Sequence, residues 1–184
     1  HFLAAALVQT GEIDDYRRHC RQILARFAGA SDPNTAERMA KDCLILPDSG
    51  VDLGAVGAWA DTAVTAGKDS GDLPWFQFCK GLAEYRQGHF AGAVDWMQRV
   101  LSHAGADFNR DVEACMVLAM AQYRSKRADE ARAALAKGVE IAETKLPKLD
   151  RGDLGGGWLD WIIAHALMRE AKALIQSPPA TPKE

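Results

Sequence analysis

Few residues of this sequence have the types and spacing that enzyme chemistry requires. The backbone N–H groups of Gly155-Gly156-Gly157, ahead of a predicted helix at Trp158, are of a kind that can hold a phosphate. However, no Lys and no Ser or Thr follows at the spacing of a phosphate-binding loop. Gly67-Lys68 fails the same test because Asp69 follows it. We interpret the glycine segment as a flexible loop between helices, and Gly67 as a helix end.

The histidines and acidic residues likewise predict no catalytic or metal site. The five histidines are dispersed, and none has a second ligand three or four residues away. His165 shares a predicted helix face with Trp158, Trp161 and Met168. This group forms either an aromatic pocket for a peptide or a packed cluster in a capping helix. No two acidic residues can be argued to converge as a general acid and base. We therefore expect this fragment not to be an enzyme and to need no metal or cofactor.

Charge and cysteine content narrow the possible partners and the compartment. A net charge of −3 provides no concentrated basic face for nucleic acid. No apolar run reaches the roughly 18 to 20 residues of a membrane-spanning helix, so we expect no membrane partner. The cysteines fall singly on apolar helical stripes, which predicts reduced, buried thiols and a cytoplasmic protein. They are Cys20, Cys43, Cys79 and Cys115.

Hydrophobic spacing is helical along the whole chain. One stripe runs through Val112, Cys115, Met116, Ala119, Met120 and Tyr123. Helix-breaking and capping residues divide the chain into about nine predicted helices. These signals are Gly11, Gly29, Asp32-Pro33, Pro47 with Gly50, Gly67, Pro74, Gly88, Asn109, Lys126 and the loop over 146–157. Short connections in a pairwise rhythm predict an all-α superhelix, a solenoid of stacked antiparallel helix hairpins.

Two of these hairpins repeat with a constant offset of 38 residues. The offset relates Tyr85 to Tyr123, Ala93 to Ala131, and Met97 to Leu135. Small residues such as Gly81 and Ala119 indicate where the two helices of a hairpin cross closely. In the second copy Lys126 stands in place of Gly88, so we expect a looser turn there.

The pattern of small residues, Tyr85, Gly88, Phe90 and Ala93 resembles the tetratricopeptide repeat. Over about residues 8–175 the chain is similar to tetratricopeptide regions that follow the catalytic domain in large bacterial serine/threonine protein kinases. Residues 16–27, 32–48, 158–161 and 169–174 carry this second resemblance. The kinase motifs themselves are missing, so the resemblance implies an accessory region.

The resemblance also implies a domain organisation. We expect one tetratricopeptide-like domain over 1–176, with a proline-containing disordered tail over 177–184. The clearest repeats span about 74–104 and 109–144. A truncated repeat covers 1–28, a degenerate pair covers 32–67, and a capping helix covers 158–175.

In such repeats the inner helices line a concave surface that binds other protein segments. The expected groove comprises Trp75, Phe78, Leu82, Tyr85 and Arg86 from one repeat, and Glu113, Met116, Met120, Tyr123 and Arg124 from the next. These positions are mainly apolar, which excludes the carboxylate clamp that some tetratricopeptide domains use. A groove edged by Arg86 and Arg124 suits an extended or helical peptide with an acidic residue. The alternative is that these side chains pack against the neighbouring repeat.

The sequence thus favours a protein–protein interaction scaffold in a larger bacterial signalling protein. The second possibility is a structural or self-assembly module that docks onto its own chain or onto another copy. A third is a helical regulator that binds a small molecule between repeats.

Overall fold

The computed structural model describes residues 1–176, apart from the side chain of Arg151. In this range the chain forms nine α-helices and no strand, which confirms the all-α prediction. The predicted disordered tail lies outside the described residues. The helices are α1 (Phe2–Thr10), α2 (Ile13–Phe27), α3 (Pro33–Leu44), α4 (Leu53–Ala66), α5 (Leu73–Arg86), α6 (Phe90–Leu101), α7 (Phe108–Arg124), α8 (Ala128–Lys145) and α9 (Trp158–Gln176). A short 3-10 helix, η1 (Leu149–Arg151), lies between α8 and α9.

The helix boundaries follow from local side-chain chemistry. The carboxylate of Asp32 accepts a hydrogen bond from the Thr35 N–H at 2.8 Å, ahead of Pro33 in the first turn of α3. Asp52 and Asp107 cap α4 and α7 in the same way. Where the breaking and capping residues predict a boundary, the helices begin and end within three residues of it.

Three helix hairpins share one turn geometry. Gly11, Gly88 and Lys126 all adopt left-handed backbone conformations, with φ of 78°, 84° and 65°. The residue after each donates its N–H to a carbonyl five residues back, in every case at 2.9 Å. These bonds are Glu12 to Leu7, His89 to Glu84, and Arg127 to Gln122. The looser turn expected at Lys126 is therefore wrong, because the lysine adopts the conformation that glycine adopts in the other two.

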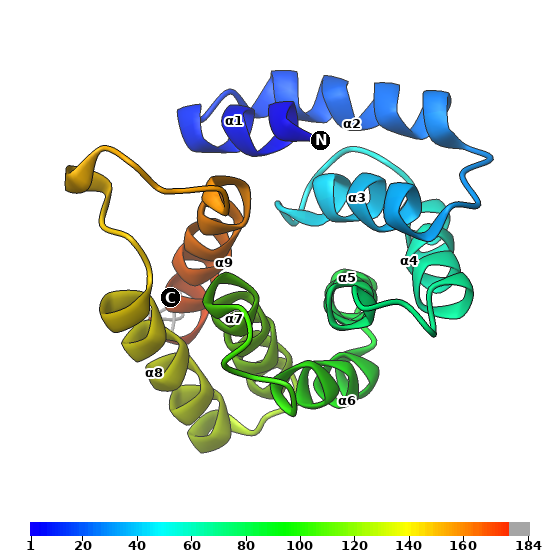
Figure 1. The fold of residues 1–184 in the computed structure, drawn as a ribbon. Coiled ribbons are helices and arrows are strands. Elements are labelled where there is room, and N and C mark those ends of the chain that lie inside the picture. The colour runs from blue at the N-terminus through cyan, green and yellow to red at the C-terminus, as the bar shows by residue number, and fades with distance from the viewer. Residues whose placement is uncertain (177–184) are drawn as a thin grey trace, which may run out of the picture.

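The odd-numbered helices form an inner layer and the even-numbered helices an outer one (Figure 1). Each outer helix packs against the inner helix before it; α4 and α6 also pack along the inner helix that follows. The helix α8 packs closely on α7 but only lightly on α9. This packing between neighbours is that of a helical superhelix built from hairpins. The inner layer is also closed, since α9 packs against both α7 and α1.

Small residues allow close helix crossings, as predicted. A Cβ atom added at Gly81 on α5 would lie 2.3 Å from Met97 Cε and 2.9 Å from Trp96 Cβ on α6. Ala93, Ala119 and Ala131 are fully buried, and all four cysteines are buried thiols, as expected. Within residues 1–176 no helix is both long enough and apolar enough to span a membrane.

Candidate functional site

The structure places most of the predicted groove residues in the interior. Phe78, Leu82, Met116 and Met120 have no exposed surface, and only 7% of Tyr85 is exposed. Glu113 is fully buried as well, whereas Trp75 and Tyr123 are half-buried and Arg124 is exposed. The buried residues therefore do not line an open groove.

On α7 the reason is α9, which packs along that helix and closes the inner layer against α1 (Figure 1), whereas α5 is covered by α3, α4, α6 and α7. Arg86 extends from α5 to α9 and forms a bidentate ion pair with Glu170, with N–O distances of 2.5 and 2.8 Å. The same guanidinium donates to the carbonyls of Leu44 and Ile45 at the end of α3. Arg86 thus pairs with an acidic residue of a helix, but this residue, Glu170, belongs to the same chain.

A second charged contact joins α3 to α9. The ammonium group of Lys41 lies 2.9 Å from the Glu37 carboxylate and 3.1 Å from the Asp160 carboxylate. It also lies 4.6 Å from the centroid of the Trp75 ring, within cation–π range. Burial opposes the charge on Lys41, but the carboxylates, Glu37 foremost, outweigh it and raise the pKa of the ammonium group. The carboxylates therefore favour the protonated form of Lys41.

The fully buried carboxyl group of Glu113 belongs to the same cluster. Neither of its oxygen atoms has a hydrogen-bond partner. Burial, with the negative charge of Asp160, raises its pKa well above the ordinary value, although Lys41 opposes the shift. A protonated carboxyl group at this position avoids an unpaired buried charge. The structure thus gathers Glu37, Glu113 and Asp160 around Lys41, although no sequence signal indicated that acidic residues converge.

Sequence reasoning missed this cluster because charged residues in amphipathic helices usually face solvent. In α3, Glu37 and Lys41 each follow a buried alanine, Ala36 and Ala40. Their four-residue spacing is that of an ordinary ion pair on a helix surface. Tertiary contacts bury both side chains. A hollow of about 220 Å³ opens beside Glu37, Lys41 and Asp160.

Some predicted groove residues meet at the turn ends of the α5–α6 and α7–α8 hairpins. Tyr85, Arg86, Phe90 and Arg124 line a small hollow of about 220 Å³. An adjoining hollow is lined by Phe90, Tyr123 and Arg124. The two tyrosines and the two arginines related by the 38-residue offset thus line two adjoining hollows at the edge of the fold.

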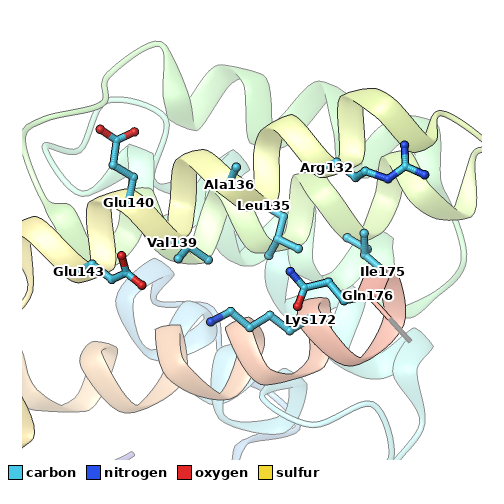
Figure 2. A pocket seen from close by; sticks show the side chains of 9 residues that line it. All are labelled: Arg132, Leu135, Ala136, Val139, Glu140, Glu143, Lys172, Ile175 and Gln176. Carbon is cyan, nitrogen blue, oxygen red and sulfur yellow. The ribbon is translucent and has the colours of Figure 1, made fainter. Parts of the chain in front are cut away.

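An open groove lies between α8 and the second half of α9, and we call it the α8–α9 groove. Figure 2 shows Leu135 and Val139 projecting from α8 toward α9, with Ile175 projecting back from α9. Arg132, Glu140 and Glu143 flank the groove on α8, and Lys172 flanks it on α9. This part of the groove has a volume of about 670 Å³.

The α8–α9 groove continues toward the 146–157 connection. A second hollow of about 530 Å³ shares Glu143 and Lys172 with the first and is lined by Trp161, His165 and Met168. The rings of Trp161 and His165 stack with their centroids 3.7 Å apart. Burial lowers the pKa of His165, and its Nδ1 lies 2.8 Å from the Trp161 carbonyl oxygen.

Only part of the predicted aromatic group lies in this second hollow. Trp158 stacks on Phe2 of α1, with ring centroids 5.6 Å apart, and is not part of the groove. The two tryptophans that the sequence placed on one helix face thus lie on different surfaces, Trp158 against α1 and Trp161 in the groove.

The described residues 1–176 contain no cluster of three His, Cys, Asp or Glu side chains that is placed to hold a metal ion. Comparison of the chain with protein-family models, with curated proteins and with solved structures found no match.

Proposed function

We propose that this chain is a protein-interaction scaffold of the tetratricopeptide type that binds an amphipathic helix of a partner protein in the α8–α9 groove. The observation that carries the proposal is the open, apolar-floored groove between two helices (Figure 2). Ligand sites are typically concave, mostly apolar and edged by a few polar groups. The resemblance to tetratricopeptide regions of bacterial kinases supports an accessory role in a signalling protein.

The packing of the two central hairpins, α3–α4 and α5–α6, supports a helix as the occupant. Helices α4 and α6 are each covered on one side by the inner helix that follows them, whereas α9 diverges from α8. The divergence follows the twelve-residue connection over 146–157, which is the longest in the chain. A partner helix in the groove would pack against α8 in the way that α5 packs against α4 and α7 packs against α6.

The charges of the groove specify the orientation of that helix. The α8 side carries Glu140 and Glu143 together with Arg132, whose charge is paired with Asp129, whereas the α9 side carries Lys172. The partner helix therefore needs an apolar stripe with basic residues on the flank toward α8 and an acidic residue toward α9. The residues from Trp161 to Ile175 span about 21 Å at 1.5 Å per residue, so about four turns fill the groove.

The test uses a fluorescent label within the groove. Because all four natural cysteines are buried, a thiol-reactive, environment-sensitive dye will label the single exposed cysteine of an Ala136→Cys variant. The ligands are two synthetic four-turn amphipathic helices of equal composition, one with the matching charge pattern and one with its basic and acidic residues exchanged. We expect the matching peptide to bind more tightly and to change the dye fluorescence.

The control compares two substitutions on the same helix. In the labelled protein, Val139→Glu places a charge on the groove floor and should abolish the response to the matching peptide. Ala133→Glu introduces the same charge at an exposed position that does not line the groove, and should leave the response unchanged. Equal responses in the two variants, or no response to either peptide, would refute the proposal.

A further inference from the structure

The concave side of the helical array already holds a helix, α9. Its apolar face, with Leu159, Ile163 and Leu167 at four-residue spacing, is buried. Backbone packing on α9 comes mainly from α7, with lighter packing from α1 and α8. Helices α3 and α5 contact α9 through two long basic side chains, Lys41 of α3 and Arg86 of α5.

These two basic side chains recognise two acidic residues on one helix. Lys41 pairs with Asp160 and Arg86 pairs with Glu170, and the side chains of both basic residues are at most 5% exposed. The two acidic residues are ten positions apart, which corresponds to about 15 Å along a helix. A planar guanidinium that binds a carboxylate through two nitrogens also restricts the orientation of its partner. The arrangement is therefore a helix-recognition site with a defined charge spacing.

The long connection between α8 and α9 makes α9 resemble a ligand that is tethered to its own binding site. Twelve residues over 146–157 join α8 to α9, and four of them are glycines. Along the opposite flank of α9 the α8–α9 groove leaves part of the helix surface uncovered. Detachment of α9 would thus break its main packing on α7, lighter packing on α1 and α8, two ion pairs and the hydrogen bond from Trp161 Nε1 to the Pro147 carbonyl.

We propose that α9 is a ligand bound in cis on the face formed by α3, α5 and α7. Its competitor for this face is an amphipathic helix of a partner protein that carries two acidic residues ten positions apart. A short tether holds α9 at a millimolar effective concentration, so the competitor binds weakly while α9 is docked. Weakening α9 increases the fraction of open sites and tightens competitor binding by the same factor. This site is distinct from the α8–α9 groove, and the two ligands would oppose each other, because the groove needs docked α9 as a wall.

The experiment uses the complete chain and a fluorescein-labelled peptide with the sequence of residues 158–176. In the test variant, Asp160→Asn and Glu170→Gln weaken the ion pairs of the chain's own α9 but leave the peptide unchanged. We expect fluorescence anisotropy to show about tenfold tighter peptide binding for each ion pair weakened, hence about a hundredfold for both. The matched control, Asp69→Asn with Asp95→Asn, removes two exposed negative charges that line none of these hollows and should leave the affinity unchanged.

Hydrogen exchange of the unmodified chain provides a second measurement that needs no variant. We expect the backbone amides of α9 to share one opening free energy that is lower than that of α7. If the α9 amides exchange only with global unfolding, the proposal is wrong. Equal peptide affinity in the test variant and the control also overturns it. A dimer in light scattering without peptide would assign the concave face to α9 of a second copy instead.

Discussion

The guanidinium of Arg86 joins three helices, and its removal tests whether this contact holds the concave side closed. It makes a bidentate pair with Glu170 of α9 and donates to the carbonyls of Leu44 at 3.0 Å and Ile45 at 2.9 Å. Only 2% of its side chain is exposed. The substitution Arg86→Met preserves most of the aliphatic packing and removes all four hydrogen bonds.

The expected cost follows from the groups left without a partner. Removing one partner of a buried ion pair costs about 3–5 kcal/mol, because the remaining charge is buried and uncompensated. Glu170 is 22% exposed and can regain some hydration, which lowers this cost. The two carbonyls lose their donor, which adds to the cost. We expect Arg86→Met to lower the free energy of unfolding by about 2–4 kcal/mol. Glu170→Gln should cost only about 1 kcal/mol, because Arg86 retains two carbonyl acceptors.

The assay is urea unfolding followed by circular dichroism, with both single variants and the double variant in a double-mutant cycle. The control Arg99→Met removes an exposed arginine from α6 and should change the free energy by less than about 0.5 kcal/mol. A cost below about 1 kcal/mol for Arg86→Met, or strict additivity of the two substitutions, would refute the reasoning. Either result would mean that apolar packing alone holds α9 in place.

Three further outcomes test other features of the fold. Lys126→Gly should raise the free energy of unfolding by about 0.5–1 kcal/mol in urea melts, because a left-handed backbone conformation strains a residue with a Cβ; the equivalent Gly88→Ala should lower it. Glu113→Gln should stabilise the protein increasingly as pH rises. Because the pKa of Glu113 is higher in the folded state, its protonation stabilises the protein. This stabilisation is fully present below the pKa of the unfolded state and is lost as pH rises through the pKa of the folded state. Urea titrations should therefore show no difference at pH 4 and a clear gain at pH 8. Gly81→Ala should cost about 1–3 kcal/mol, because the new methyl group lies 2.9 Å from Trp96 Cβ, an atom next to the backbone that cannot move aside as Met97 Cε can.

Local chemistry in the sequence was sufficient to predict the helices and their hairpins. Proline and glycine positions, the Asp32 cap and the 3.6-residue apolar period act over a few residues, so their effects do not depend on the rest of the fold. The 38-residue offset likewise located two equivalent turns, since Tyr85 and Tyr123 occupy matching positions. The exception at Lys126 shows that hairpin packing can impose a left-handed conformation on a residue that disfavours it.

Only the tertiary structure decided which faces of these helices are free. Spacing predicted which side chains share a stripe, but each inner helix here is covered on several sides, so Phe78 and Met120 are interior. Whether Arg86 would meet a partner protein or its own chain depended on the path of α9, which a glycine-containing connection does not specify. The charged cluster around Lys41 was unpredictable for the same reason: its carboxylates come from residues 37, 113 and 160. Local sequence determines helices through short-range forces, whereas burial and charge pairing depend on contacts between residues far apart in the chain.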